Sequence, residues 1–301
     1  MMKWAIEVKG ISKKYKHFQL KHIDLSVEEG TVMGLIGPNG AGKSTIMRIM
    51  MGLLHPDIGP EIHTVQVLGQ SIPQQQAVAK KDIGYYCEDM RLYAKESIDW
   101  HMQFVRSIYP KWDDVYAQEL LDRFGLIAEQ RVKGLSHGQR VKAMLLMLFA
   151  RRPKLLILDE PTTGLDPVAR HEILAELMRV VEDEQRTILF SSHNTQDVEQ
   201  ICDNITFIDR GQVIESRQRD AFLDHWRRIR LHVPIDWTMP ELPGTRIENI
   251  FRQQRILSSN QFDDSIPERL QSSGAKIEGV DRMSLDEIFV SCVMQGRGEP
   301  K

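Results

Sequence analysis

The fold of this chain is decided by Gly37-Pro38-Asn39-Gly40-Ala41-Gly42-Lys43-Ser44-Thr45. The spacing Gly-x-x-x-x-Gly-Lys-Ser is typical of a phosphate-binding loop, in which glycines let backbone N–H groups approach a phosphate. Lys43 would bring a positive charge to the β- and γ-phosphates, and the Ser44 hydroxyl can ligate Mg²⁺. The apolar run 31–36 predicts a buried strand before the loop. Residues 43–54 predict a helix whose N-terminus points at the phosphates, so a ligand-free glycine turn is the weaker interpretation.

Composition indicates a globular protein. The chain has 301 residues, 42% of them hydrophobic, and a net charge of −3, which argues against a surface that coats nucleic acid. Its three cysteines, Cys87, Cys202 and Cys292, form neither a disulfide framework nor a zinc pattern. The longest apolar run, 143–150, is too short to span a bilayer, and no signal peptide is visible. We therefore expect a cytoplasmic protein that reaches a membrane only through a partner.

Hydrophobic periodicity divides the chain into regions. Residues 4–8, 20–27 and 65–68 predict strands of a small antiparallel layer. Apolar residues then recur at helical spacing over 97–125, and Pro110 predicts a break between two helices. We interpret about 90–150 as a helical insertion.

The later part of the chain returns to alternating strands and helices. Continuous apolar runs at 155–158 and 187–190 predict buried parallel strands, with a crossover helix over 168–181 between them. Residues 205–214 predict a hairpin. Composition changes near Ser216, where Arg, Gln and Pro become frequent. We therefore predict an α/β nucleotide-binding domain over 1–215 and a small accessory α/β domain over 216–301.

Two acidic residues end the strand at 155–158. Asp159 and Glu160 would lie at the carboxyl end of a parallel strand, where such sheets bind their ligands. Asp159 would hold Mg²⁺, and Glu160 would orient or deprotonate the attacking water. The alternative is that these two acids form a solvent-exposed turn with no catalytic role.

The segment Leu135-Ser136-His137-Gly138-Gln139 adds a second diagnostic motif. Ser136 is a good N-cap for a helix over 139–149, and a helix N-terminus attracts anions. With the motifs above, this segment resembles the signature of the ABC ATPases, which reads Leu-Ser-Gly-Gly-Gln in that family. The resemblance covers roughly residues 4–215 and implies a P-loop NTPase core of α/β class that binds ATP and Mg²⁺. It also implies that Ser136, Gly138 and Gln139 face the nucleotide of a second subunit.

Three further positions follow the order of the ABC ATPase family. Gly164-Leu165-Asp166-Pro167 resembles the D-loop that reaches across the dimer. His193, after the strand 187–190, resembles the switch histidine at the γ-phosphate. Tyr15 resembles the aromatic residue that stacks on adenine, although nearby Phe18 leaves a core role open for either ring.

Position 88 departs from the family pattern. The family has a glutamine after the strand at 83–86, whereas this chain has Glu88. Some export-type members carry glutamate there, so the resemblance implies that Glu88 contacts Mg²⁺ and the attacking water. A carboxylate that merely points to solvent is the alternative.

Two stretches with less specific motifs indicate which subfamily of the ABC ATPases the chain resembles. Residues 109–114 and 283–289 resemble YtrB-type and sodium- or drug-export-type bacterial ATPases. We therefore predict the ATP-hydrolysing subunit of a bacterial exporter, working as a homodimer or with a paralogous ATPase, and driving transmembrane permease subunits without binding nucleic acid. The alternatives are a non-transport ABC ATPase acting on nucleic acid or the ribosome, and a nucleotide sensor without turnover. Non-transport ABC ATPases of this kind have tandem nucleotide domains or long coiled-coil insertions, and this sequence shows neither.

Overall fold

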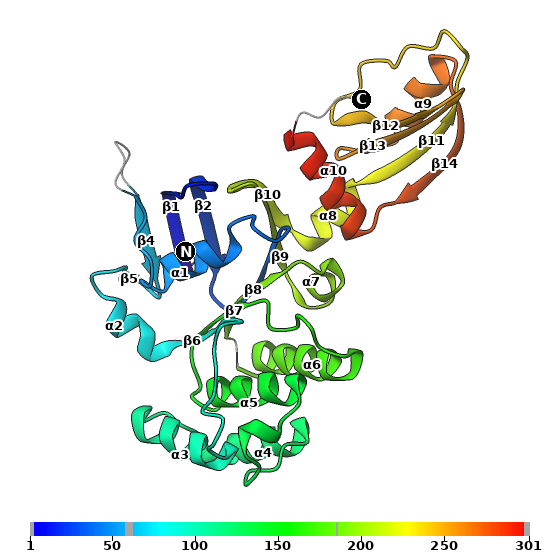
Figure 1. The fold of residues 1–301 in the computed structure, drawn as a ribbon. Coiled ribbons are helices and arrows are strands. Elements are labelled where there is room, and N and C mark those ends of the chain that lie inside the picture. Colours follow the sequence, from blue (N-terminus) through cyan, green and yellow to red (C-terminus); the bar gives the residue numbers. More distant parts are fainter. Residues whose placement is uncertain (1–2, 58–62, 185, 298–301) are drawn as a thin grey trace. The chain divides into compact units, whose positions relative to one another are not determined.

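The chain divides between Val213 and Ile214 in the computed structural model, which describes residues 3–57, 63–184 and 186–297. The division lies beside the boundary proposed from composition at Ser216. The unit that ends at Val213 holds the nucleotide motifs (Figure 1). No helix in the described ranges has both the length and the apolar character needed to cross a membrane.

A six-stranded sheet forms the centre of the first unit. Its order is β10-β9-β3-β8-β7-β6. Strands β3 (Val32–Ile36), β7 (Leu155–Asp159) and β8 (Thr187–Ser192) are buried along their whole length, as their continuous apolar runs predict. β6 (Ile83–Tyr86) and β9 (Asn204–Asp209) flank them in parallel, and β10 (Gln212–Gln218) completes the predicted hairpin.

The predicted antiparallel layer is present as a sheet of order β2-β1-β4-β5. Its strands are β1 (Trp4–Lys14), β2 (Gln19–Glu28), β4 (Thr64–Val67) and β5 (Gln70–Ser71). β1 continues six residues beyond the predicted 4–8, and its pairing with β2 shifts register after Val8 and Ile11. Such bulges interrupt the alternation of polar and apolar residues, so the sequence pattern stops short of the strand's end.

Helix α1 (Lys43–Met50) follows the phosphate-binding loop and joins both sheets. Its residues Ile46, Met47 and Met50 belong to one hydrophobic core with β1, β3 and β7. The prediction that this helix reaches residue 54 is wrong. Gly52 has φ of 63°, and the N–H of Leu53 donates to the Arg48 oxygen, a geometry that ends a helix with a left-handed glycine.

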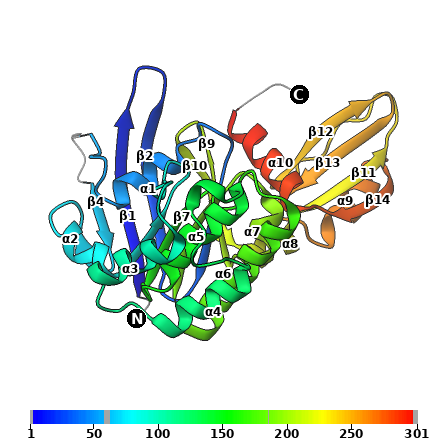
Figure 2. The same ribbon diagram turned by 60° about the horizontal axis from the view of Figure 1, so that its bottom comes forward.

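Helices lie on the opposite face of the six-stranded sheet, some packed against its strands and others against these helices (Figure 2). α3 (Ile98–Ile108) and α4 (Asp114–Phe124) are capped by Ser97 and Asp113, and the predicted break at Pro110 lies between them. α5 (His137–Phe149) and α6 (Pro167–Glu184) pack on each other, and α7 (Thr195–Ile201) packs on β3 and β8. The sequence patterns missed α7 and the single turn α2 (Gln76–Ala79), which are short.

The second unit contains an antiparallel sheet of order β12-β13-β11-β14. Its strands are β11 (Arg227–His232), β12 (Thr245–Phe251), β13 (Gln254–Ser259) and β14 (Lys276–Arg282). Its helices are α8 (Arg219–His225), α9 (Ser265–Ser272) and α10 (Leu285–Arg297). Ile229, Leu231, Leu257 and Leu270 form its own core. The sequence predicts strands over 229–233, 245–250 and 255–258 and helices near 267–272 and 284–294, but it does not predict α8 or β14. β14 is a mostly exposed edge strand that contains Gly279, so its apolar signal is weak.

Candidate functional site

The carboxyl ends of four neighbouring parallel strands assemble the site. Along the order β3-β8-β7-β6, these ends lead into the phosphate-binding loop, His193, Glu160 and Glu88. Ile36 pairs with Ser192, Asp159 with Ser191, and Tyr86 with Leu158, so the strands end nearly level. The topology therefore brings residues from four distant stretches of sequence to one edge of the sheet.

The geometry of the phosphate-binding loop requires its glycines. A side chain at Gly37 would lie 2.3 Å from the backbone oxygen of Ile208, and one at Gly42 would lie 2.5 Å from Leu20. Gly42 also has φ of 114°, a conformation that L side chains rarely adopt. Pro38, Asn39, Gly40 and Ala41 lead into α1, whose first turn contains Ser44 and Thr45. The loop thus presents backbone N–H groups at the N-terminus of a helix, as an anion site requires.

Lys43 and Glu160 form an ion pair at the centre of the site. The Lys43 Nζ lies 3.0 Å from Glu160 Oε1 and donates to the Gly37 oxygen at 2.6 Å. The Lys43 side chain is only 5% exposed. Glu160 Oε2 accepts from Thr163 Oγ1 at 2.8 Å and lies 2.7 Å from His193 Nδ1. The carboxylate is therefore held from three sides.

Burial and charge act in opposite directions on Glu160. Burial alone would raise its pKa, but the charge of Lys43 and hydrogen bonds from Thr163, Lys43 and His193 outweigh burial and leave the pKa below its usual value. Glu160 also has φ of 55°, which is uncommon for a residue with a side chain. Strained backbone of this kind is typical of functional sites.

Asp159 and Ser44 offer oxygen ligands for Mg²⁺. Asp159 is buried, and its Oδ1 accepts a hydrogen bond from Ser191 Oγ at 2.7 Å, which fixes the carboxylate. The described residues contain no group of three His, Cys, Asp or Glu side chains that would enclose a metal. Mg²⁺ does not need one, because it keeps waters and phosphate oxygens as ligands and takes one or two groups from the protein. The residues therefore fit Mg²⁺.

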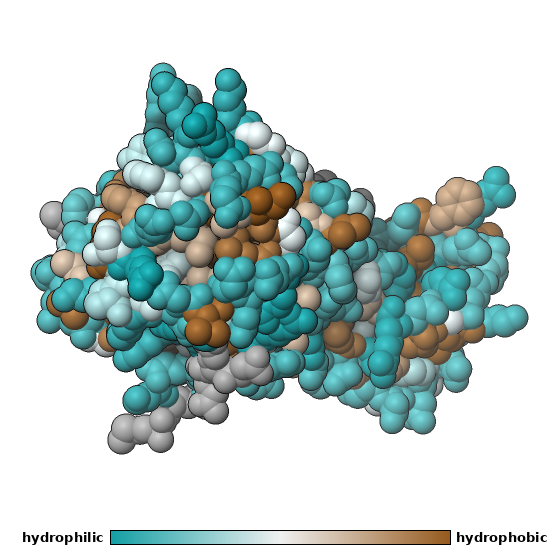
Figure 3. Space-filling model, turned by 90° about the horizontal axis from the view of Figure 1, so that it is seen from below, coloured by the Kyte–Doolittle hydropathy of each residue, from teal (hydrophilic) through white to brown (hydrophobic). Residues whose placement is uncertain are grey.

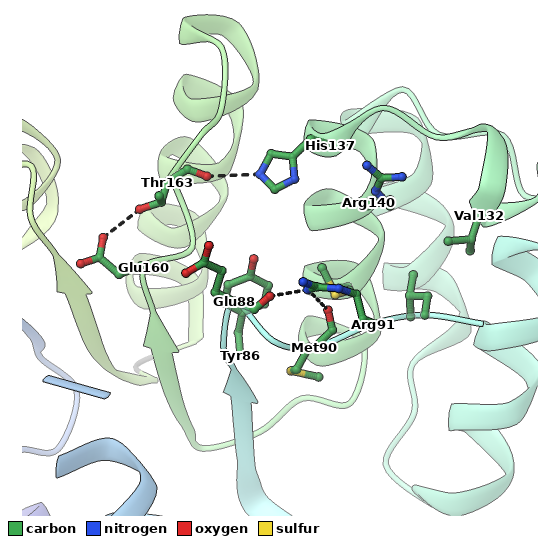
Figure 4. A pocket seen from close by; sticks show the side chains of 11 residues that line it. Tyr86, Glu88, Met90, Arg91, Val132, His137, Arg140, Glu160 and Thr163 are labelled. Atoms are coloured by element: carbon green, nitrogen blue, oxygen red, sulfur yellow. Dashed lines mark hydrogen bonds between the residues drawn. The ribbon is translucent and has the colours of Figure 1, made fainter. Parts of the chain in front are cut away.

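Glu88 lines a cavity of about 70 Å³ together with Glu160. Figure 4 shows these two acids on one side and Arg91, His137 and Arg140 on the other. Arg91 donates to the backbone oxygens of Glu88 and Met90, and so holds the loop after β6 in place. The Glu88 carboxylate is exposed and has no hydrogen bond or ion pair to the described residues.

The N-terminus of α5 is closed by a capping box. The Gln139 N–H donates to Ser136 Oγ at 3.2 Å, and the Ser136 N–H donates to Gln139 Oε1 at 2.9 Å. Ser136 is therefore the N-cap, as predicted, although the helix begins at His137 rather than at Gln139. Gly138 packs closely on α6, since a Cβ there would lie 3.2 Å from that of Ala169.

Asp166 caps α6 within the chain. Its Oδ1 accepts from the N–H groups of Val168 and Ala169 at 2.9 and 3.0 Å. These bonds, led by that of Ala169, lower the pKa of Asp166. Tyr15 directly follows β1, is 43% exposed, and its ring centre lies 6.2 Å from that of Phe18. Phe18 packs toward Gly42, so Tyr15 is the ring left accessible.

Comparisons with known proteins identify the family. The family described as ABC transporter matches residues 20–163. The ABC transporter ATP-binding protein YtrB of Bacillus subtilis is 29% identical, over 95% of this chain and 97% of YtrB. Nod factor export ATP-binding protein I of Rhizobium johnstonii is 32% identical, over 73% of this chain and 71% of that protein. The chain belongs to the ABC transporter ATP-binding proteins.

Solved structures of ABC transporter ATP-binding proteins share the fold. The structure of an ATP-binding subunit of an ABC transporter has a TM-score of 0.64 and 26% identity, covering 73% of this chain and 92% of that chain. The ATP-binding cassette MJ0796, in a dimeric post-hydrolysis state with ADP and Pi, has a TM-score of 0.62 and 21% identity, covering 71% and 98%. The predicted P-loop NTPase core is therefore confirmed, and the chain is an ATP-binding, ATP-hydrolysing transporter subunit that uses ATP and Mg²⁺.

The site of this ABC transporter ATP-binding protein also contains residues that sequence reasoning missed. Thr163 and Ser191 donate to the two acids, yet neither stands in a predicted motif position. Ser191 had a weak signal, because a hydroxyl at the end of a strand lies next to the end of its parallel neighbour. Thr163 had none, since its contact depends on the path of the loop after Glu160.

Proposed function

We propose that this chain hydrolyses ATP with Glu160 as the group that orients or deprotonates water, as one subunit of a bacterial exporter. The observation that supports this most is the placement of the Glu160 carboxylate, held by Lys43, Thr163 and His193 at the end of the phosphate-binding loop. A solvated acidic turn would not need three partners around a largely buried carboxylate. The relatives are named as ATP-binding proteins of an ABC transporter and of Nod factor export, and neither name supports action on nucleic acid or the ribosome.

The loop and Lys43 bind the phosphates in this proposal. Backbone N–H groups of the loop 37–45, other than that of Pro38, which has none, surround the β-phosphate, and the Lys43 ammonium pairs with phosphate oxygens. Triphosphate oxygens compete with Glu160 for the same ammonium, because Lys43 Nζ lies only 3.0 Å from Glu160 Oε1. Binding of ATP therefore loosens the ion pair and frees Glu160 Oε1 for a water molecule. Tyr15 supplies an accessible ring for adenine.

Glu160 and His193 then act on water and the γ-phosphate. His193 Nδ1 holds Glu160 Oε2, which leaves the other oxygen to orient water. Ser44, Asp159 and Glu88 would hold Mg²⁺, which when bound neutralises charge on the phosphates. Glu88 shares a cavity with Glu160, so we place it beside the reacting water. The lowered pKa of Glu160 means that the carboxylate is ionised at neutral pH, so it can accept a hydrogen bond from the attacking water and orient it.

A second subunit completes the site. The capped N-terminus of α5 presents Ser136 and the N–H of Gly138 as an anion site. This site is distinct from the chain's own phosphate-binding loop, which leads into α1. We propose that two ATPase subunits, identical or paralogous, sandwich two nucleotides, each between the loop of one subunit and α5 of the other. Asp166 and Gln139 then lie at the dimer contact.

Exposed aromatic residues on α3 and in the segment before it suggest where a membrane partner docks. Tyr93, Trp100 and Phe104 are 65%, 38% and 46% exposed, and the rings of Trp100 and Phe104 stack 5.4 Å apart. Figure 3 looks onto the side that carries α3 and α4, where apolar residues interrupt the polar surface. Exposed aromatic clusters are typical of protein interfaces. We propose that permease subunits bind here, next to the Glu88 loop, which would hold the chain at the inner face of the membrane.

Docking can be tested by co-purification. The chain is co-expressed with the integral membrane proteins encoded in neighbouring genes, and Trp100→Ala with Phe104→Ser is compared with Val115→Ser, an exposed apolar residue on α4. We expect the double variant to lose the membrane partner and any stimulation of ATPase activity, while Val115→Ser keeps both. Equal recovery of the partner by all three proteins would contradict the proposed surface.

A further inference from the structure

The histidine in the signature segment contacts the loop that follows Glu160. His137 occupies a position at which the ABC signature reads glycine, so its side chain is a departure of this sequence. Its Nε2 lies 3.2 Å from the backbone oxygen of Thr163 (Figure 4). A carbonyl oxygen only accepts hydrogen bonds, so Nε2 carries the proton and donates. A glycine at this position could not make the contact.

The same Thr163 connects this contact to the reacting carboxylate. Its backbone oxygen accepts from His137, and its hydroxyl donates to Glu160 Oε2 at 2.8 Å. Two hydrogen bonds through one residue therefore link His137 to Glu160. They connect the first turn of α5 to the end of β7, which are separate in sequence.

The loop after Glu160 is firmly anchored on either side of Thr163. Before it, the buried Thr162 hydroxyl donates to Asp197 Oδ2 at 2.7 Å. After it, Asp166 caps α6. At Thr163 itself the backbone N–H makes only a long bond of 3.3 Å to the Glu160 oxygen. The next residue, Gly164, has φ of 72° and packs under the imidazole, where an added Cβ would lie 3.4 Å from Nε2. His137 thus contacts a residue whose own backbone N–H is held only by a long hydrogen bond.

We propose that His137 is a positioning residue for ATP hydrolysis, which fixes Thr163 so that the Thr163 hydroxyl holds Glu160. This inference rests on the proposed function, in which Glu160 acts on the water. It has a consequence for the two nucleotides of the dimer, because α5 serves the site opposite to the one that contains its own Glu160. His137 then couples the two sites, and such coupling acts equally in both directions on binding.

Steady-state ATPase kinetics of His137→Ala and His137→Gln test the proposal. We expect the alanine variant to lose roughly five- to tenfold in kcat, the effect of about one hydrogen bond, with KM for ATP changed by less than about twofold. Glutamine offers an N–H at similar reach and should restore most of the rate. His171→Ala, an exposed histidine on α6, serves as the matched control and should leave the kinetics unchanged. Thermal unfolding of each variant shows whether it is folded.

A double-mutant cycle with Thr163→Val separates positioning from a general structural effect. Valine keeps the branched shape of threonine but removes the hydroxyl that reaches Glu160. If His137 acts through Thr163, His137→Ala should cost little further kcat once the hydroxyl is gone. Additive losses in the double variant would overturn the proposal.

Two further kinds of outcome distinguish a failure of this inference from a failure of the proposed function. An active parent with an unaffected His137→Ala variant, or equal losses in the alanine and glutamine variants, would overturn this inference and leave the proposed function standing. A folded parent chain that does not hydrolyse ATP would contradict the proposed function and this inference with it.

Discussion

At the scale of single residues, the site depends on how one carboxylate is held. The Glu160 side chain is largely buried, and burial disfavours its negative charge. The charge of Lys43 and hydrogen bonds from Thr163 and His193 compensate for this loss of hydration. The same contacts set its direction toward the phosphate-binding loop. A residue that is both ionised and fixed in direction is what water activation requires.

The lowered pKa of Glu160 predicts how stability depends on pH. The charged form stabilises the folded chain fully above the usual pKa of 4.5, and this contribution is lost as pH falls through the lower folded pKa. Glu160→Gln lacks the titrating group. We therefore expect the melting temperature of the parent, relative to that of Glu160→Gln, to fall between pH 7 and about pH 3. A difference that stays constant over this range, measured by circular dichroism, would show that the carboxylate is not held as described.

At the scale of elements, the order of parallel strands explains why the site could largely be predicted. Apolar runs identified β3, β7 and β8, and residues directly after such strands must meet at one edge of the sheet. Contacts that depend on loop paths could not be predicted, such as those of Thr163 and His137. The end of α1 at Met50 was also missed, because a helical pattern continues in the sequence past the glycine that stops the helix.

A further prediction concerns Glu88, in the loop after β6. Glu88 adds a full negative charge beside a triphosphate, which is unfavourable unless Mg²⁺ or a basic group offsets it. Its carboxylate is exposed and lines the same cavity as Glu160. We therefore expect Glu88 to contact the nucleotide site closely only when Mg²⁺ is bound. Glu88→Gln and Glu88→Ala should shift the Mg²⁺ optimum of ATPase activity or abolish stimulation by membrane subunits. Mg²⁺ titrations that superimpose on the parent's, with and without those subunits, would count against this role.

At the scale of the whole molecule, the chain combines two units with separate cores. Every predicted nucleotide residue lies in the first unit. The similarity to YtrB covers 95% of this chain and so includes most of the second unit, whereas that to the Nod factor export protein covers 73%. We infer that the second unit is an accessory domain with a regulatory or partner-binding role.

Truncation tests this division. A chain that ends after Gln218 keeps β10, the edge strand of the six-stranded sheet, and loses the antiparallel sheet of the second unit. We expect it to fold and to bind ATP with the affinity of the full chain in calorimetry, because the two cores share no residue. Insolubility or weaker ATP binding would place the boundary elsewhere.

Glu160→Gln tests the central claim most directly. The amide keeps the shape of the carboxylate but cannot take a proton from water, so ATP should still bind while hydrolysis falls at least about a hundredfold. Two subunits should then remain closed on uncleaved ATP. Size-exclusion chromatography with ATP and Mg²⁺, run beside an ATPase assay, measures both effects. The account predicts a stable dimer with almost no turnover. A monomer that hydrolyses ATP at the parent's rate would contradict it.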